Sequence, residues 1–437
     1  MSFPRYAAYR DSGVAWLGDV PAHWAVMPIK RLAFLQSGES ITAERIDESG
    51  DFPVYGGNGL RGYTNAFTHA GEFVLIGRQG ALCGNINYGY RKFWASEHAV
   101  VVTPTKSLTT KWLGEVLRAM NLNQYSVSAA QPGLSVEAVA QLMIPVPLRE
   151  EQAAIATFLD HETAKIDALV DVQKRLIELL KEKRQAVISQ AVTKGLDPNV
   201  PMKDSGVEWL GEVPGHWELG GLTRFIGPVV DYRGRTPTKV DEGVFLVTAR
   251  NIQNGKIDYT ASEEYVDAES AGSLLDRGRP EMGDLLFTME APLGQVALID
   301  RTDIALAQRI VKFRGRQGVL QSDFLLYWFM GDHCQARLMT LATGSTALGI
   351  KASKLGMIEC LVPPLDEQAE IVQFVEREFE ALDALVEQAE VASLLLVERR
   401  AALISAAVTG KIDVRGLARS TDKVAASAHK PPPAVLS

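Results

Sequence analysis

Apolar residues recur with a seven-residue repeat from Leu148 to Thr193, which is the strongest pattern in the chain. The stretch is preceded by prolines and followed by Gly195 and Pro198, and it contains no Gly or Pro. From Ile155 the apolar positions follow in alternating steps of four and three residues, a spacing typical of a coiled-coil helix. The pattern therefore predicts one helix roughly 60–65 Å long.

The same pattern occurs a second time. Glu367–Thr409 aligns with Glu151–Thr193 at a constant offset of 216 residues, without a gap. Two equal apolar seams in one chain most simply bury each other. We therefore predict that the two helices form an intramolecular antiparallel coiled coil related by an approximate two-fold axis.

Charged residues interrupt the two seams at equivalent positions and suggest a register. If each acidic residue faces a basic residue across the seam, the numbers of any two facing residues add up to 561. A charge in a dry seam is costly unless it is paired, although the same side chains could instead extend to solvent at the seam's edge. The predicted contacts are Glu162 with Arg399, Lys183 with Glu378, Leu169 with Ala392, and Leu176 with Leu385.

A shorter repeat precedes each long helix. Residues 11–24 read DSGVAWLGDVPAHW and residues 204–217 read DSGVEWLGEVPGHW. Between this framework motif and the helix, each half contains a different segment with short β-like runs and Gly-rich loops, which predicts a mixed α/β domain. The fold class is thus α+β. From the paired repeats we also predict that the two variable domains share one fold, that an approximate two-fold axis across the helix pair relates them, and that the two ends of the chain lie near each other. The predicted parts are a first variable domain at 1–147, a helix at 148–199, a second variable domain at 200–364, a helix at 365–412 and a disordered tail at 413–437.

The apolar runs also predict individual elements. Strands are expected at Phe52–Tyr55, Glu72–Ile76, Ala99–Thr103, Val244–Thr248, Asp284–Met289, Gln295–Ile299 and Ala307–Phe313. Helices are expected at Thr110–Leu122 and Ser322–Leu341.

Composition is that of an ordinary globular protein, with 46% hydrophobic and 22% charged residues. The net charge of −8 argues mildly against nucleic acid. It is +1 over residues 1–147 (12 Lys and Arg against 11 Asp and Glu) and −4 over 201–364 (17 against 21). Binding to a polyanion would therefore need local clusters or a partner's charge. We expect no membrane span and no signal peptide, hence a cytoplasmic protein.

Motifs for catalysis are missing from the sequence. Gly57–Gly62 satisfies the GxGxxG pattern after a strand, but no helix pattern follows, so we interpret it as a set of turns and not a dinucleotide site. His23 and His216 lie inside the framework motif beside tryptophans, where a structural role is favoured over a general base. No P-loop, GxSxG or HExxH motif occurs, and we predict a binding protein that uses no metal or cofactor of its own.

Loops in which Arg lies beside an amide side chain can hydrogen-bond the edges of guanine and adenine, and loops with small hydrogen-bond donors and a Lys can bind phosphates. Each such loop could also be a solvated surface. The candidate DNA-binding residues are Arg61, Arg78, Gln79, Arg233, Arg235, Arg250, Asn251 and Lys351.

Several segments together carry a family resemblance. They are the two framework motifs, GDFPVYGGNGLRGY and QPGLS in the first domain, LVTARNIQNGKID, GDLLFTMEAPLGQVALID and GIKASKLGMIECLVPPLDEQ in the second, and the helix ends AVTKGLD and AVTGKID. On these the chain resembles the specificity subunits of type I restriction–modification systems, nearly throughout to about Arg415.

The resemblance implies two target-recognition domains that each read one half of a split double-stranded DNA target, with the two helices as an antiparallel spacer. Helices roughly 60 Å long would fix the gap between the half-sites at about one to two turns of DNA. It also implies two modification (adenine methyltransferase) subunits and two restriction subunits as partners, which carry the S-adenosylmethionine, ATP and Mg²⁺ chemistry. Two other classes remain: a coiled-coil scaffold, which would not need two unlike domains, and a methyltransferase fused to its reader, which would need catalytic motifs.

Overall fold

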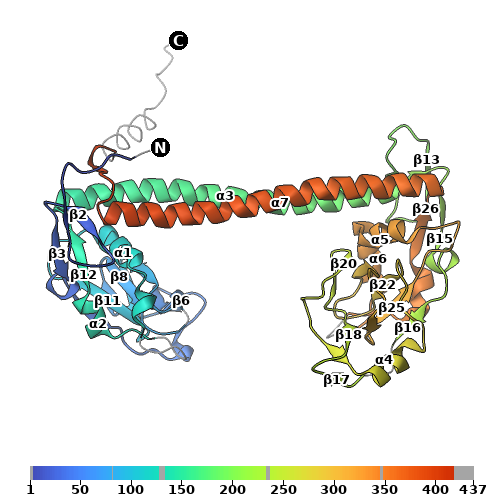
Figure 1. The fold of residues 1–437 in the computed structure, drawn as a ribbon, viewed down its shortest axis with the longest axis horizontal. Coiled ribbons are helices and arrows are strands. Elements are labelled where there is room, and N and C mark those ends of the chain that lie inside the picture. The colour runs from blue at the N-terminus through green and yellow to red at the C-terminus, as the bar shows by residue number, and fades with distance from the viewer. Residues whose placement is uncertain (1–2, 81, 127–132, 233–236, 345–347, 418–437) are drawn as a thin grey trace, which may run out of the picture. The chain divides into compact units, whose positions relative to one another are not determined.

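The computed structural model describes residues 3–80, 82–126, 133–232, 237–344 and 348–417. It divides into two compact units, one made of Met1–Gln173 with Val391–Ser437 and the other of Lys174–Glu390. The long helices α3 (Arg149–Lys194) and α7 (Leu365–Val408) each contribute one part to each unit (Figure 1). The prediction of an α+β protein with two mixed domains and two long helices is confirmed.

Two four-stranded sheets build the reader domain of the first unit, meaning its part between the framework motif and α3. One is antiparallel, in the order β4-β11-β8-β9. The other has the order β6-β5-β10-β7, with β10 parallel to β5. The strands are β4 (Ala33–Ser37), β5 (Phe52–Gly56), β6 (Gly59–Thr64), β7 (His69–Ala70), β8 (Phe73–Gly77), β9 (Ile86–Gly89), β10 (Lys92–Ala95) and β11 (Ala99–Pro104).

Shorter elements connect this reader domain to the framework. β1 (Tyr9–Asp11) pairs with β2 (Asp19–Pro21), and β3 (Ala25–Pro28) pairs with β12 (Met143–Val146), both antiparallel. The helices are α1 (Thr110–Ala119) and α2 (Val136–Gln141). One core contains residues of α1, β8 and β11 together with Ile155 and Leu159 of α3. The start of the long helix is therefore part of the first reader's core.

The second unit repeats this plan. Its antiparallel sheet has the order β16-β25-β22-β23, and its mixed sheet has the order β17-β21-β18-β24, with β18 parallel to β24. The strands are β13 (Met202–Asp204), β14 (Glu212–Pro214), β15 (Glu218–Gly221), β16 (Val230–Asp231), β17 (Lys239–Val240), β18 (Val244–Val247), β19 (Ile252–Gln253), β20 (Lys256–Ile257), β21 (Tyr265–Val266), β22 (Leu285–Thr288), β23 (Val296–Leu298), β24 (Ile304–Leu306), β25 (Ile310–Phe313) and β26 (Glu359–Val362). The helices are α4 (Ala268–Leu275), α5 (Ser322–Met330) and α6 (Asp332–Leu341).

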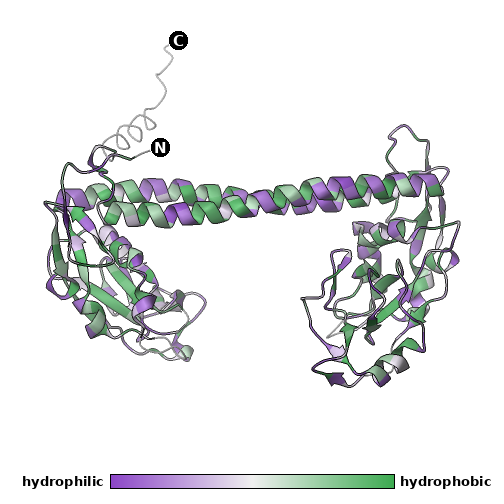
Figure 2. Ribbon diagram, in the orientation of Figure 1, coloured by the Kyte–Doolittle hydropathy of each residue, from purple (hydrophilic) through white to green (hydrophobic). Residues whose placement is uncertain are grey.

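The reader domains share a fold, as predicted. The triplet β6-β5-β10 corresponds to β21-β18-β24, and the pair β3·β12 corresponds to β15·β26. Apolar residues follow the central strands of each unit, as Figure 2 shows for the ribbons. The second reader adds the hairpin β19-β20 and helices α4 and α6. The predicted two-fold axis between the readers stays a prediction.

Most predicted strands are found within one or two residues of their expected ends. Two expectations need correction. The run Ala307–Phe313 forms a strand only from Ile310 onward. The expected helix Ser322–Leu341 is two helices, because Gly331 has an extended backbone, with φ −65° and ψ 142°, and α6 restarts after it.

The long helices run antiparallel within each unit. In the first unit Asp167 of α3 pairs with Arg400 of α7 at 2.8 Å. In the second unit Arg184 pairs with Asp383 at 2.6 Å and its guanidinium lies 3.9 Å from the centre of the Phe379 ring. The pair of antiparallel helices predicted from the repeat is therefore confirmed.

The predicted register is wrong. The numbers of each observed ion pair add to 567, whereas the predicted register requires 561, a displacement of about six residues or roughly 9 Å. Glu162 pairs with Lys165 of its own helix at 2.7 Å instead of Arg399, and Lys183 and Arg399 are exposed. The charged groups lie at the seam's edge, which was the alternative interpretation.

The buried seam also follows the opposite order of steps: where a step of three residues was expected the buried positions are four apart, and where four was expected they are three apart. From Leu159 the more buried positions of α3 are 163, 166, 170, 173, 177, 180, 184 and 187. Leu169, Leu176 and Leu385 are 49%, 41% and 47% exposed, and Ala392 is half-buried, so the leucine contacts predicted for them are wrong. Thr163 can occupy the seam because its hydroxyl donates to the Leu159 carbonyl at 2.7 Å, whereas a carboxylate at 162 would need a partner.

Segments near the two ends of the described chain meet in the first unit. The amide of Asp413 donates to the carbonyl of Pro4 at 2.8 Å, and the Tyr9 hydroxyl donates to the Gly410 carbonyl at 3.0 Å. Val414 is fully buried in the core. The predicted nearness of the two ends is confirmed, while the prediction of disorder from residue 413 is wrong as far as 417. Residues 418–437 lie outside the described residues.

Candidate nucleic-acid interface

A histidine of each framework motif contacts a glutamate in the first turn of a long helix. His23 lies 3.0 Å from Glu151 at the start of α3, and His216 lies 2.8 Å from Glu367 at the start of α7. The neighbouring Trp24 and Trp217 are buried (each 1% exposed). Both histidines thus join the motif to a helix, in agreement with the structural interpretation.

The residue after each of these glutamates fastens the reader domain to the same helix turn. Gln152 accepts a hydrogen bond from the Thr109 amide at 3.1 Å and donates to the Pro147 carbonyl at 3.0 Å. Gln368 accepts from the Gln321 amide at 2.8 Å. Because Thr109 and Gln321 are the N-cap residues of α1 and α5, each glutamine couples a reader helix to a long helix.

Three loops meet at one edge of the first reader. They are the β5–β6 turn with Asn58, the loop after β8 with Arg78 and Gln79, and the β10–β11 turn with His98. The Arg78 amide donates to the His98 carbonyl at 2.8 Å, and the side chains of Gln79 and His98 are 3.1 Å apart. Gly57–Gly62 belongs to the β5–β6 hairpin, so the turn interpretation of this motif is confirmed.

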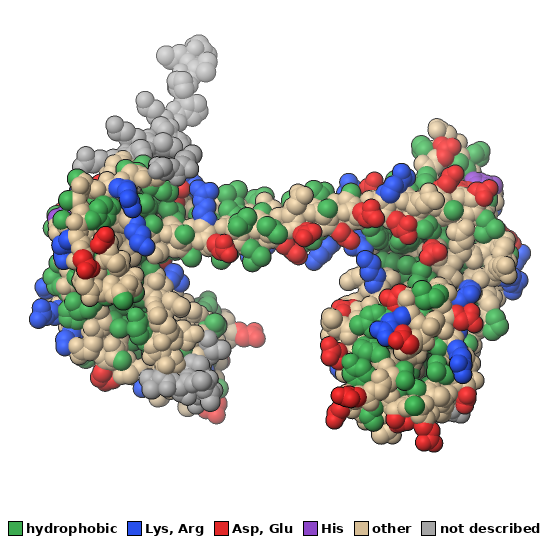
Figure 3. All heavy atoms as spheres, viewed as in Figure 1, with side chains coloured by type: hydrophobic (Ala, Val, Ile, Leu, Met, Phe, Trp, Pro, Cys, Tyr) green, Lys and Arg blue, Asp and Glu red, His purple; other side chains and the backbone are tan. Residues whose placement is uncertain are grey.

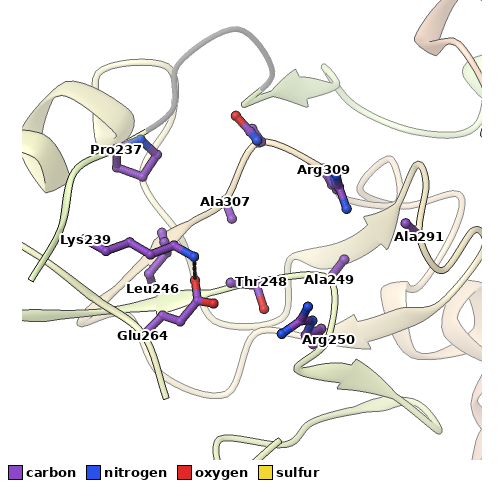
Figure 4. Close-up of a pocket in the computed structure, with 11 residues that line it drawn as sticks. Pro237, Lys239, Leu246, Thr248, Ala249, Arg250, Glu264, Ala291, Ala307 and Arg309 are labelled. Carbon is purple, nitrogen blue, oxygen red and sulfur yellow. Dashed lines mark ion pairs between the residues drawn. The ribbon is translucent and has the colours of Figure 1, made fainter. Parts of the chain in front are cut away.

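The equivalent loops of the second reader border a pocket of about 260 Å³. Arg250 follows β18, and Arg309 precedes β25, where its Nε lies 3.2 Å from the carboxylate of Glu290. In Figure 4 both arginines lie on the side of the pocket away from the Lys239–Glu264 pair, whose charged atoms are 2.7 Å apart. Arg250 makes no hydrogen bond or ion pair with the described residues.

A scan of family models finds the type I restriction modification DNA specificity domain over residues 21–181 and 238–391, most of the chain. The chain belongs to this family.

Relatives of this specificity family agree. The chain is 43% identical over 174 residues to the specificity subunit of the type I restriction enzyme EcoprrI from Escherichia coli, covering 39% of this chain and 43% of that relative. It is 24% identical over 338 residues to a type I specificity subunit from Haemophilus influenzae, covering 76% of this chain and 81% of the relative.

Solved structures show the same fold. A chain from a type I R-M system assembly matches with a TM-score of 0.65 at 14% identity, over 89% of this chain and 98% of that one. The HsdS subunit from Thermoanaerobacter tengcongensis matches with a TM-score of 0.50 at 14% identity, over 90% and 98%. The family match and the sequence relatives identify the chain as a type I DNA specificity subunit, and the solved structures show that it has the same fold. Within the described residues, every helix is too short or too polar to span a bilayer.

One of the predicted DNA contacts, Asn251, is wrong. Asn251 is fully buried, and its side-chain amide makes four hydrogen bonds of 2.9 Å, to Thr248 before it and to the segment that follows β20. Its oxygen accepts from the amide and hydroxyl of Thr248, and its nitrogen donates to the carbonyls of Asp258 and Ser262. No group of Asn251 is left for a base, and the residue holds the turn from which Arg250 projects.

The other candidates differ in their freedom to contact DNA. Arg61, Gln79 and Lys351 are exposed. Arg78 is half-buried and donates to the Ser37 hydroxyl at 3.1 Å, which directs its guanidinium toward β4. Arg233 and Arg235 lie outside the described residues.

The sequence reasoning missed Asn58, His98, Glu290 and Arg309. A usable signal exists, because His98 and Arg309 each directly precede a strand whose first residues are buried. Acidic and basic side chains are mixed over both units on the face shown in Figure 3, in keeping with the balanced charge of the sequence.

Proposed function

We propose that each reader domain of this specificity subunit reads one half of a bipartite double-stranded DNA target, and that the subunit recruits two modification subunits and two restriction subunits in the cytoplasm. The subunit itself catalyses nothing. S-adenosylmethionine, ATP and Mg²⁺ act on the partner subunits.

The observation that carries this proposal is the repetition of one reader fold with different side chains at its loop edge. Asn58 and Gln79 are exposed and His98 is half-buried in one reader, whereas Arg250 and Arg309 border the pocket of the other. Two readers that differ in this way would select two different sequences, as a split and asymmetric target requires.

Charge also favours an assembly over a free subunit. Phosphate contacts dominate the affinity of DNA-binding proteins. Neither reader segment is strongly basic, at +1 for residues 1–147 (12 Lys and Arg against 11 Asp and Glu) and −4 for 201–364 (17 against 21). The modification subunits would then supply much of the phosphate contact, and the isolated chain would bind DNA weakly.

The test is methylation of a randomised duplex library by the chain co-purified with the modification subunits of its own genome. The expected product is adenine methylation in two defined half-sites separated by a fixed number of unread base pairs. Methylation by the modification subunits without this chain, or a single continuous site, would contradict the proposal. Methyl transfer by the chain alone would favour a fused enzyme.

A further inference from the structure

The loop edges of the two readers are built on the same backbone frame. The Ser96 amide donates to the Tyr55 carbonyl at 2.9 Å in the first reader, as the Ala307 amide donates to the Val247 carbonyl at 2.9 Å in the second. This bond ties the end of β5 to the turn after β10, and the end of β18 to the turn after β24.

A second pair of bonds extends the equivalence. The Arg78 amide donates to the His98 carbonyl at 2.8 Å, and the Met289 amide donates to the Arg309 carbonyl at 2.9 Å. The carbonyls of Arg78 and Met289 in turn accept from Leu134 and Ile350, both at 3.0 Å. Counting from these bonds makes three side-chain positions equivalent: Asn58 with Arg250, Gln79 with Glu290, and His98 with Arg309.

These three positions share their environment but not their chemistry. In both readers the second and third side chains contact each other, at 3.1 Å between Gln79 and His98 and at 3.2 Å between Glu290 and Arg309. The first position is exposed in both readers, although Asn58 Oδ1 accepts a hydrogen bond from Asn85 at 3.1 Å. If two copies of one fold are to select different sequences, the backbone frame must stay the same while the side chains on it differ.

The side chains indicate which bases are chosen. Glu290 holds Arg309 through Nε, which leaves its terminal nitrogens to donate, and Arg250 makes no hydrogen bond or ion pair with the described residues. Two such guanidinium groups match the O6 and N7 acceptors of guanine. Amide side chains such as Asn58 and Gln79 match the N6 donor and N7 acceptor of adenine.

Resting on the proposed function, we infer that these three positions determine specificity in each reader. Arg250 and Arg309 select guanine in the half-site of the second reader, with Glu290 as a positioning residue. Asn58 and Gln79 select adenine in the half-site of the first.

The experiment measures base preference with the assembled methylation complex and a randomised target library. Arg250→Ala and Arg309→Ala should each lower a guanine preference in one half-site by about tenfold or more, as loss of one bidentate contact does. The other half-site should keep its preferences. Arg301→Ala is the matched control, since Arg301 pairs with Asp303 before β24 begins, away from the turn that follows β24.

A second variant tests the first reader separately. Asn58→Ala with Gln79→Ala should relax an adenine preference in the opposite half-site and leave the guanines unchanged. Variants that lower methylation equally on all sequences, or that alter the half-site of the other reader, would overturn the inference. A wild-type complex that selects no bipartite sequence would instead overturn the proposed function.

Discussion

Replacing Gln368 with alanine should destabilise the second unit more than replacing any exposed residue of α7 would. The residue is fully buried, and its amide nitrogen donates to the carbonyls of Pro363 at 2.8 Å and Val319 at 2.9 Å, while its oxygen accepts from the Gln321 amide. Gln368→Ala leaves these three backbone groups without their partner. A buried polar group that loses its partner costs about 1–3 kcal/mol, so we expect a total of about 3–5 kcal/mol.

The equivalent glutamine of the first unit, Gln152, provides a second measurement with which the loss of stability can be compared. Gln152 makes two such hydrogen bonds, one to Pro147 and one from Thr109, so Gln152→Ala should cost less, about 2–3 kcal/mol, and should act on the first unit. Gln373→Ala is the control on the same helix as Gln368, because Gln373 is exposed and should stay within about 0.5 kcal/mol of the wild type.

Amide hydrogen exchange measures these effects unit by unit. Two units joined by helices do not guarantee one unfolding transition, so a single melting temperature would mix them. In Gln368→Ala the Gln321 amide and the start of α5 should lose protection, while the start of α1 keeps it. Unchanged protection at Gln321, or a loss no larger than that of Gln373→Ala, would refute the reasoning.

Three further results are expected. Asn251→Ala should cost about 2–4 kcal/mol in local unfolding measured by hydrogen exchange, since its buried side-chain amide makes four hydrogen bonds; a neutral effect would contradict a positioning role. Arg400→Ala should cost at most about 1 kcal/mol in denaturant unfolding, because its partner Asp167 is 53% exposed; a larger loss would contradict an edge position for this pair. Hydrogen bonding to Arg415 lowers the pKa of Asp413, so the stabilisation from Asp413 is complete above the ordinary pKa of about 3.9 and is lost as the pH falls through the lower folded value. The stability difference between wild type and Asp413→Asn should therefore be largest at pH 5 and shrink as the pH falls below about 3.9, and a difference that does not shrink would count against this account.

The sequence was sufficient for the elements that depend on local periodicity. Both long helices, their antiparallel pairing and most strands followed from apolar spacing and from the repeat at offset 216. The seam alternation did not follow, because adjacent apolar residues such as Leu169 and Val170 satisfy both alternations of steps. Only tertiary packing shows that Val170 is the more buried of the two.

The loop edge of each reader was harder to predict, because the order of strands in the sheet brings its residues together. Arg250 and Arg309 are distant in sequence and border one pocket only because β24 pairs in parallel with β18. Asn251 looked like a base-contacting residue beside Arg250, but backbone groups at Asp258 and Ser262 bury it. Local residue type cannot reveal which backbone groups will surround a side chain in the folded chain.

Exchange of the second reader tests the central claim most directly. Residues 218–364 would be replaced by the corresponding segment of another specificity subunit whose target is determined, and the methylated sequence would be mapped with the assembled complex. Independent readers predict that one half-site changes to that of the donor, while the other half-site and the number of unread base pairs stay the same. A change in both half-sites, or no change in either, would contradict the account.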